Sequence, residues 1–313
     1  MKFSVTIPAY KSRYLREAIQ SIASQTIDNW ELIIVDDCSP EDIRSVVEPF
    51  MTDSRIRYYR NEKNCGAVNV VDNWNICLGY CTGDYVICMG DDDRLLPNCL
   101  ADYQTLIEKY PGLNVYHTRT EIIDETGALV ALQEQRPEWE SALAMLWNRW
   151  DHRNKQYIGD FCYQTQYLKQ AGGYYKLPLA WGSDDITALL GAKEKGIANM
   201  QEIGFQYREN RQTISSSTQN ARIKIEARIA QQTWFAGFLE DMSKKVLPAL
   251  DRKYLQTISE PRQRYFFEAL DQDCPHYIQG LPQRLLWCYR VLQPLHYGKG
   301  IFLKWYLKSI RRA

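Results

Sequence analysis

Gly83-Asp84-Tyr85-Val86-Ile87-Cys88-Met89-Gly90-Asp91-Asp92-Asp93 is the stretch that decides the fold. Its apolar middle, residues 85–89, is typical of a β-strand that is covered on both faces. Three aspartates follow directly, and an α/β sheet places its ligands just beyond the carboxyl ends of its strands. The stretch therefore predicts an α/β fold with a ligand site at the end of this strand.

The acidic triplet has a physical explanation in a bound cation. Asp91, Asp92 and Asp93 would repel one another, and a divalent cation would relieve that repulsion. Oxygen ligands suit Mg²⁺ or Mn²⁺, which usually bind few protein carboxylates and share the rest of their shell with substrate phosphates. A solvated turn, or a helix N-cap before Leu95-Leu96-Pro97, is the simpler alternative. The triplet alone leaves both interpretations open.

The residues before the triplet alternate between strand and helix patterns. Apolar residues at every second position from Phe3 to Ile7 predict a strand that ends at Pro8, and residues 31–35 and 55–59 predict two more. Three helices are expected between these strands: one capped by Ser12, one that begins at Ser39 and one that contains Trp74. Strands that alternate with helices form a mostly parallel sheet.

The remaining residues predict a second group of elements. Antiparallel strands are expected at residues 113–118 and 121–130, and Asp184-Asp185 head a helix that Gly196 ends. From residue 219 the pattern is helical, with breaks expected near Pro248, Pro261, Pro275, Pro282 and Pro294. We therefore place a domain boundary near Thr218, between residues 1–218 and a helical region at 219–313.

The sequence lacks two common motifs that bind the phosphates of a nucleotide. It contains no Gly-x-Gly-x-x-Gly and no Gly-x-x-x-x-Gly-Lys-Ser/Thr, so no glycine cradle would hold a diphosphate and a metal is left to neutralise it. Asp36-Asp37 follows the strand at 31–35, where a carboxylate can accept hydrogen bonds from a uracil or thymine ring or from ribose hydroxyls. The two acidic clusters are placed to face one ligand.

A set of ordered motifs runs along about residues 1–216. It consists of Val5-Thr6-Ile7-Pro8-Ala9-Tyr10, Ser24-Gln25-Thr26, Leu32-Ile33-Ile34-Val35-Asp36-Asp37-Cys38-Ser39, Asn64-x-Gly66, Asn75, Gly83-Asp84-Tyr85-Val86 with the triplet and Pro97, Gly172-Gly173-Tyr174, Ser183-Asp184-Asp185, Lys195-Gly196, and Tyr207-Arg208 followed by Ser215. In this order the set resembles glycosyltransferase family 2, and the order is more specific than any single motif.

The resemblance implies a GT-A fold, a Rossmann-like mixed α/β sheet flanked by helices, here with a C-terminal helical extension. It also implies metal-dependent transfer of a sugar from a nucleotide diphosphate sugar, with inversion at the anomeric carbon. The implied nucleotide-sugar site consists of Pro8, Ala9, Tyr10, Asp37, Asn64, Asp91 and Asp92. Asp92 would be the main ligand of Mn²⁺ or Mg²⁺, with Asp91 and Asp93 as further candidates. The chain departs from the family pattern at Gly90, where many relatives have aspartate, and at Asn210, where many have histidine.

Asp184-Asp185 supplies the candidate catalytic base. Inverting transfer needs a base on the face opposite the leaving group, and a helix dipole would keep these carboxylates ionised. The resemblance assigns the role to Asp185, with Asp184 as the alternative, while an ordinary N-cap pair is the structural explanation. Trp181 is a candidate platform for an acceptor sugar, or a core residue. Arg208 could bind phosphate or form a surface ion pair.

The C-terminal tail is basic and amphipathic. Asp273 is the last acidic residue, and seven basic residues follow it. A helix from Ile301 would place Lys304, Lys308, Arg311 and Arg312 on one face and Phe302, Leu303, Tyr306, Leu307 and Ile310 on the other. This pattern predicts contact with an anionic membrane surface, and a helix docked on its own domain or on a second subunit is the alternative.

The expected partners and location follow from these features. We expect a UDP-sugar donor, a lipid-linked or surface-polysaccharide glycan acceptor that could carry a polyprenyl diphosphate, and no nucleic acid; a homo-oligomer stays open.

Nine scattered cysteines indicate free thiols in a reducing cytoplasm, and we expect neither a signal peptide nor a membrane-spanning helix. This predicts a peripheral protein on the inner face of the cytoplasmic membrane. A sugar nucleotidyltransferase and a non-catalytic carbohydrate-binding relative are the alternatives.

Overall fold

The structure is a computed structural model, and it describes residues 1–210 and 218–311. The chain divides into two compact units, Met1–Asn210 and Arg211–Ala313. Each unit is described by itself below. The assignment of two domains with a boundary near Thr218 stays a prediction.

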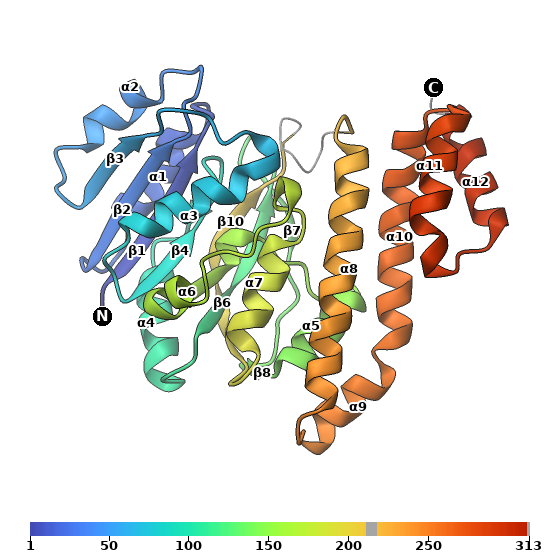
Figure 1. The fold of residues 1–313 in the computed structure, drawn as a ribbon. Helices are drawn as coiled ribbons and strands as arrows, with labels where there is room; N and C mark the ends of the chain where they lie inside the picture. Colours follow the sequence, from blue (N-terminus) through green and yellow to red (C-terminus); the bar gives the residue numbers. More distant parts are fainter. Residues whose placement is uncertain (211–217, 312–313) are drawn as a thin grey trace. The chain divides into compact units, whose positions relative to one another are not determined.

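One mixed sheet forms the frame of the first unit (Figure 1). Its main path runs in the order β3-β2-β1-β4-β9-β6-β10-β5, while β7 pairs with β6 and β8 pairs with β10. The strands are β1 (Phe3–Ala9), β2 (Trp30–Asp36), β3 (Ile56–Arg60), β4 (Tyr85–Cys88), β5 (Arg94–Leu95), β6 (Val115–Ile123), β7 (Leu129–Leu132), β8 (Trp139–Glu140), β9 (Phe161–Gln164) and β10 (Ile197–Arg208). The first four strands along this path are parallel, as predicted.

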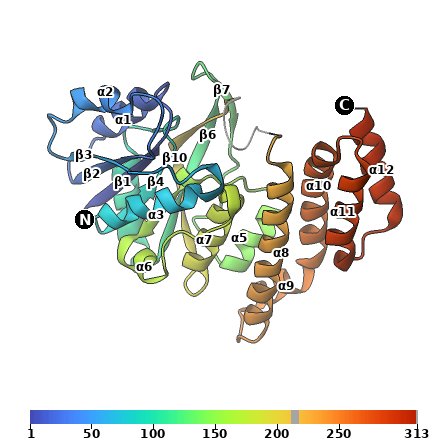
Figure 2. The same ribbon diagram turned by 45° about the horizontal axis from the view of Figure 1, so that its top comes forward.

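Helices cover both faces of this sheet (Figure 2). The longer ones are α1 (Leu15–Ala23), α2 (Ile43–Val47), α3 (Val70–Tyr80), α4 (Cys99–Lys109), α5 (Ala142–Trp150), α6 (Thr165–Gln170) and α7 (Ser183–Ala192). Phe3, Val5 and Ile7 join the apolar faces of α1, α2 and α4 in one buried cluster. Because neighbouring strand residues point to opposite faces, the residues between them face the layer that contains α3. The expectation that the strand before the acidic triplet is covered on both faces is confirmed, since Val86, Ile87 and Cys88 of β4 are all buried.

Several predicted boundaries are wrong. Ser12 does not cap α1, because its hydroxyl donates to Glu41 at 2.6 Å instead. The two strands expected at 113–118 and 121–130 are one long strand, β6, and its partner β7. The turn between β6 and β7 is closed by the side chain of Asp124, whose Oδ1 accepts from the N–H groups of Thr126 and Ala128.

The second unit is helical and has its own core. Its helices are α8 (Ala221–Ser243), α9 (Ala249–Thr257), α10 (Ser259–Ile278), α11 (Pro282–Leu292) and α12 (Lys299–Ile310). Two of the expected proline breaks are wrong. Pro261 lies in the first turn of α10, where its missing N–H has no intrahelical partner to lose, and α10 continues through Pro275 to its end. In the described residues, no helix has the length and apolarity needed to cross a bilayer.

The tail helix α12 is docked on α10. Trp305 is fully buried, and its indole donates to Asp271 Oδ1 at 3.0 Å. Lys308 pairs with the same carboxylate at 2.8 Å and Lys304 at 3.4 Å. Leu303, Leu307 and Ile310 remain 58%, 52% and 50% exposed. The apolar face predicted for this helix is therefore divided between the protein core and solvent, and Arg312 lies outside the described residues.

Candidate functional site

The ends of several strands meet at one edge of the sheet. β1, β2 and β4 are parallel. β9 is antiparallel to both β4 and β6, so β6 points the same way as β4, and β10 is parallel to β6. This edge therefore carries residues 8–10, Asp37, the acidic triplet and the end of β10, where an α/β fold places its ligands.

Asp91 anchors the loop that follows β1. Its Oδ2 accepts hydrogen bonds from the backbone N–H groups of Tyr10 and Lys11, both at 2.7 Å. The Ser39 hydroxyl donates to the carbonyl of Tyr10 at 2.6 Å, and the N–H of Asp37 donates to the carbonyl of Ala9 at 2.9 Å. The ring of Tyr10 stays 42% exposed. The predicted nucleotide loop thus has a fixed backbone and an accessible aromatic ring.

Asp92 and Asp93 face different neighbours. Asp93 is buried, and its two carboxylate oxygens accept from the N–H of Arg208 at 2.9 Å and the N–H of Gly90 at 3.3 Å. The carboxylate of Asp92 accepts from the side-chain amide of Asn210. The residue that stands in place of the family's histidine therefore contacts the predicted metal ligand directly.

Arg208 is buried. Of its two predicted roles, the ion pair at the surface is therefore wrong, because its ion pair starts from a buried guanidinium. Its Nε donates to the carbonyl of Asp92 at 2.8 Å, and its Nη2 pairs with Glu17 at 2.8 Å. The guanidinium also lies 4.2 Å from the ring centroid of Tyr14. Arg208 therefore ties the end of β10 to the triplet and to α1.

Ionisation of the triplet is unfavourable in this setting. Burial, and then the charge of Asp92, raises the pKa of Asp91 to about 6. Burial also raises the pKa of Asp92, and burial with the charge of Asp92 raises that of Asp93 well above its ordinary value. A cation would lower this cost.

The donor set fits a metal that takes few ligands from the protein. No three Asp, Glu, His or Cys side chains of the described ranges converge to form a complete metal site. Asp91 and Asp93 are held by backbone N–H groups, whereas the carboxylate of Asp92 meets the neutral amide of Asn210. Mg²⁺ and Mn²⁺ sites with one or two carboxylates are completed by substrate phosphates. Asp92 fits that role best among the three.

Asp37 organises the loop at residues 61–66. Its Oδ1 accepts from the side-chain amide of Asn61 at 2.8 Å and from the N–H of Cys65 at 2.9 Å. Asn61 also donates to Asn73 on α3 at 3.0 Å. Asn64 lies in the same loop and is partly exposed. The structure thus brings Asp37 and Asn64 together beside the β1 loop, with Asn61 as a link that the sequence did not single out.

The acidic pair opens α7. Gly182, with φ of 88°, turns the chain into this helix, and Trp181 before it is partly exposed. Near the other end of α7, Gly191 packs against Val115 at the start of β6. At the amino end, Asp184 interacts electrostatically with Asp160, which accepts a hydrogen bond from Thr120 further along β6, so α7 runs antiparallel to β6. Its amino end, with Asp184 and Asp185, therefore points toward the carboxyl end of that strand.

Asp185 forms an ion pair that sequence reasoning missed. Arg149 Nε lies 3.0 Å from its Oδ1 and Nη2 lies 3.3 Å from its Oδ2. Asp185 is buried, whereas Asp184 is partly exposed. Burial, and then the charge of Asp185, raises the pKa of Asp184. Arg149 is 36 positions from Asp185 and belongs to no motif, so the sequence carried no signal for it.

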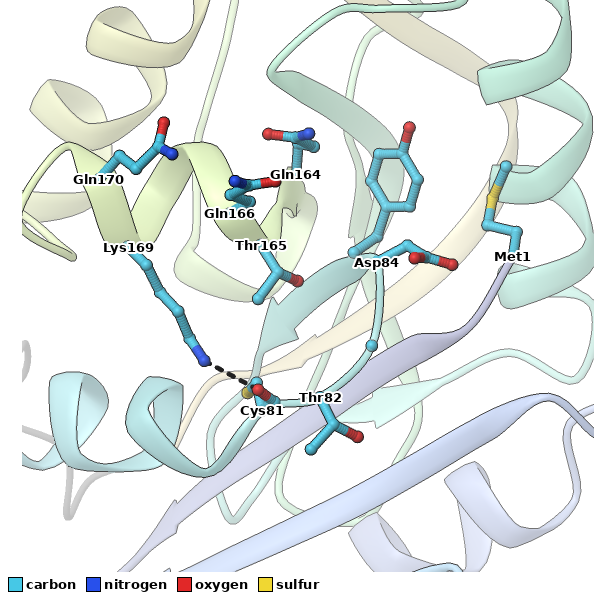
Figure 3. A pocket seen from close by; sticks show the side chains of 11 residues that line it. Met1, Cys81, Thr82, Asp84, Gln164, Thr165, Gln166, Lys169 and Gln170 are labelled. Carbon is cyan, nitrogen blue, oxygen red and sulfur yellow. Dashed lines mark hydrogen bonds between the residues drawn. The ribbon is translucent and has the colours of Figure 1, made fainter.

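A separate pocket lies at the opposite edge of the sheet (Figure 3). It has a volume of about 750 Å³ and is lined by residues at the starts of β1 and β4 and around the start of α6. Lys169 donates across it to the carbonyl of Cys81 at 2.8 Å. None of the predicted site residues lines it. Its position, at the amino ends of the parallel strands, is not where this class of fold binds its ligand.

Comparison with known proteins supplies the family. The model of "Glycosyl transferase family 2" matches residues 4–166, just over half of the chain. The chain belongs to glycosyltransferase family 2. It is 36% identical over 110 residues to the GalNAc(5)-diNAcBac-PP-undecaprenol beta-1,3-glucosyltransferase of Campylobacter jejuni, covering 34% of each chain. It is 29% identical over 113 residues to the poly(ribitol-phosphate) beta-N-acetylglucosaminyltransferase TarS of Staphylococcus aureus, covering 35% of this chain and 19% of TarS.

The same fold occurs in a solved structure. A crystal structure of S. aureus TarS in complex with UDP-GlcNAc superposes with a TM-score of 0.65 at 17% identity, over 98% of this chain and 89% of that one. The predicted GT-A fold, a mixed sheet flanked by helices, is confirmed. The matched segments span less than half the length of the first curated relatives.

Proposed function

We propose that this family 2 member is a metal-dependent, inverting glycosyltransferase that moves a sugar from a UDP sugar to a glycan acceptor. One observation carries the proposal. A single sheet edge carries the anchored β1 loop, Asp37 and three carboxylates whose ionisation is unfavourable, and the acidic pair of α7 points toward it. This is the set of groups that a nucleotide, a diphosphate with its cation, and an acceptor hydroxyl would need.

Different residues of the chain would bind the nucleoside and the cation. The ring of Tyr10 and the carboxylate of Asp37 are positioned to contact the nucleoside. Asp92 would hold the cation, with Asp91 and Asp93 maintaining the backbone around it through the hydrogen bonds described above. When bound, Mn²⁺ or Mg²⁺ would stabilise the negative charge of the departing diphosphate.

The acidic pair provides the base. The acceptor hydroxyl gives its proton to a carboxylate of Asp184-Asp185, and the oxygen's electron pair forms the new bond to the anomeric carbon. The bond from that carbon to the diphosphate breaks, and its electrons leave with the nucleoside diphosphate. Because attack comes from the face opposite the leaving group, the configuration inverts. A positioned base is worth about 10²–10⁴ in rate.

The acceptor class is proposed from the relatives. Their names refer to a glycan on undecaprenol diphosphate and to poly(ribitol phosphate). We therefore infer a lipid-linked glycan or surface polysaccharide as the acceptor. The test is a thermal-shift panel of UDP-glucose, UDP-galactose and UDP-GlcNAc with and without Mn²⁺, followed by UDP release with a polyprenyl-diphosphate glycan. A ligand that binds the folded state raises its stability. Absence of any shift across the panel would reject the donor class, and equal shifts with and without Mn²⁺ would reject the metal dependence.

Membrane contact is proposed for the exposed half of α12. Phe302 and Trp305 are buried in the second unit, so the stripe open to a bilayer consists of Leu303, Leu307 and Ile310. Lys299 and Arg311 at the two ends of the helix are exposed. Apolar residues bordered by basic ones are suited to an anionic interface. On this basis we propose a peripheral position on the inner face of the cytoplasmic membrane.

A further inference from the structure

The pocket at the amino ends of the parallel strands has walls that are tied to each other (Figure 3). Its volume of about 750 Å³ lies within the range of small-molecule sites, about 300–1,000 Å³. Strands β4 and β9 pair here with Tyr85 opposite Gln164, and the chain passes from β9 directly into α6. The N–H of Thr165 donates to the carbonyl of Asp84 at 2.9 Å. The start of α6 is therefore fixed against the loop before β4.

The loop before β4 is itself held in place. A Cβ on Gly83 would lie 2.8 Å from the carbonyl oxygen of Lys2 and from the backbone nitrogen of Ser4, so this position has no room for a side chain. The N–H of Gly83 donates to the hydroxyl of Ser4 at 2.9 Å. Lys169 reaches across from α6 and donates to the carbonyl of Cys81 at 2.8 Å. The pocket therefore has a defined shape before any ligand binds.

Thr165 supplies a buried hydroxyl on the wall of this pocket. The residue is 5% exposed, and its Oγ1 has no hydrogen-bond partner among the described residues. Figure 3 shows the side chain pointing from the start of α6 toward the loop before β4. Most buried polar groups of native proteins are paired, and leaving one unpaired is costly. A ligand with a hydrogen-bonding group at this point would remove the cost.

The charged side chains of the lining balance each other. They are the ammonium of Lys169 and the carboxylate of Asp84. The thiol of Cys81 and the phenol of Tyr85 stay neutral, because burial raises the pKa of both groups. A phosphate, a carboxylate or a cation would meet one favourable and one unfavourable charge here. The lining is therefore suited to a neutral ligand.

Three glutamine amides complete the lining. The Oε1 of Gln164 accepts from the N–H of Tyr167 at 2.8 Å, while Gln166 and Gln170 are exposed and lie four positions apart on one face of α6. An amide carries a donor and an acceptor side by side, as adjacent hydroxyls of a sugar do. The ring of Tyr85 offers an apolar surface for the C–H face of a sugar. Together these groups match a polyhydroxylated ligand.

We propose that this pocket is a second carbohydrate site, which binds a neutral sugar unit of the glycan acceptor away from the edge where transfer takes place. The ligand class follows from the lining, and its assignment to the acceptor rests on the proposed function. β1 runs from the pocket to the edge with the acidic triplet, and its seven residues, at about 3.3 Å each, separate the two by roughly 20 Å. A glycan of several sugar units could reach both, and binding at two points raises its affinity.

The first test needs no transfer. Protein labelled with ¹⁵N-glutamine is titrated by NMR with maltotriose, N,N′,N″-triacetylchitotriose and lactose. The side-chain amide signals are assigned by their loss in Gln164→Ala, Gln166→Ala and Gln170→Ala. We expect these signals to shift with at least one of the sugars and to stay in place with inorganic phosphate. Absence of shifts with all three sugars, or equal shifts with phosphate, would overturn the proposal.

Thr165→Val separates binding from folding. It replaces the unpaired hydroxyl by a methyl group of similar size, so its thermal stability should equal or exceed that of the wild type. The Kd of the sugar should rise about five- to tenfold, the usual worth of one neutral hydrogen bond, and Thr165→Ser should restore it. Gln166→Ala with Gln170→Ala should also weaken binding. Gln256→Ala with Gln272→Ala, at exposed positions of α9 and α10, should not. Unchanged affinity in both pocket variants would refute the site.

The second test compares a short and a long polyprenyl-diphosphate glycan as acceptors. In the variant with Gln166→Ala and Gln170→Ala, the KM of the long glycan should rise about tenfold or more as the second contact is lost. Its kcat and the KM of the short glycan should not change. An unchanged KM for the long glycan would overturn the assignment to the acceptor. If no UDP sugar supports transfer while the sugars bind as expected, the proposed function fails and the carbohydrate site stands.

Discussion

Asp91→Asn should stabilise the protein in the absence of metal and nucleotide. The carboxyl of Asp91 has its pKa raised from 3.8 to about 6 by burial and then by the charge of Asp92. At one pKa unit per 1.36 kcal/mol, the rise corresponds to about 3 kcal/mol. Asp91 is partly exposed, so solvent screening reduces the usable figure to about 1–2 kcal/mol. The hydrogen bonds from Tyr10 and Lys11 lower this pKa and are already contained in the value.

The sign of the pH dependence follows from the direction of the shift. A folded pKa above the unfolded one means that the contribution of Asp91 to stability is complete below about pH 3.8 and is lost as the pH rises through about 6. The advantage of Asp91→Asn should therefore be largest near pH 7.5 and shrink toward zero as the pH is lowered toward 4.

Urea unfolding, followed by tryptophan fluorescence at several pH values, measures this difference. The matched variant is Asp91→Ala, which also removes the charge but leaves the N–H groups of Tyr10 and Lys11 without their acceptor. Each lost acceptor costs about 1–3 kcal/mol where the donor is shielded from water. Asp91→Ala should therefore be less stable than Asp91→Asn at every pH. If the two variants behave alike, or if the advantage of Asp91→Asn does not change with pH, the reasoning about the triplet is wrong.

Three further predictions concern ligands and the tail. Asp92→Asn should remove the Mn²⁺-dependent part of UDP binding in calorimetry, and equal affinity in both proteins would contradict its role as metal ligand. Asp37→Ala should weaken UDP binding about tenfold even in EDTA, because it removes a nucleoside contact worth about 1.4 kcal/mol; an effect seen only with metal would reassign the residue. Replacing Leu303, Leu307 and Ile310 by serine should release the protein from phosphatidylglycerol vesicles in co-sedimentation. Val246→Ser, at a fully exposed position of the same unit, should not, and unchanged binding by the triple variant would favour the docked helix as the only role of α12.

β1 and β2 were predictable because each has a clear strand pattern. β1 has apolar residues at every second position from Phe3 to Ile7, and β2 has the apolar run Leu32–Val35. β9 was missed because four residues are too few to distinguish a strand from a short buried helix. β10 was missed for a different reason. Its register with β6 shifts twice near Ile203, and the exposed Glu202 and the buried Gly204 interrupt the alternation that marks a strand.

The site was predictable only as far as its motifs reach. Acidic residues at strand ends can be placed from the sequence, because strand order and direction fix which edge they share. Their partners cannot be placed, because Arg149, Asn61 and Arg208 come from elements that approach only after folding, and none of these contacts has a periodicity.

The tail gave the opposite result. Its amphipathic pattern was correct as a helix, but hydropathy cannot decide which apolar side chains enter a core, so Trp305 became the anchor and Leu303 stayed outside.

In the proposed function one sheet edge binds two kinds of ligand, and the contrast between the triplet and the acidic pair gives a physical reason for it. At the triplet, three carboxylates share one short segment, and the contacts to Asp91 and Asp93 described here are backbone N–H groups, which leaves a charge that an external cation can meet. At the pair, Arg149 already neutralises Asp185, so an added cation would have less to gain. The same residue type is thus suited to metal in one place and to proton transfer in the other. The difference lies in the partner of each carboxylate. Replacing Arg149 by a neutral residue should leave the acidic pair with a charge that an external cation can meet, as at the triplet.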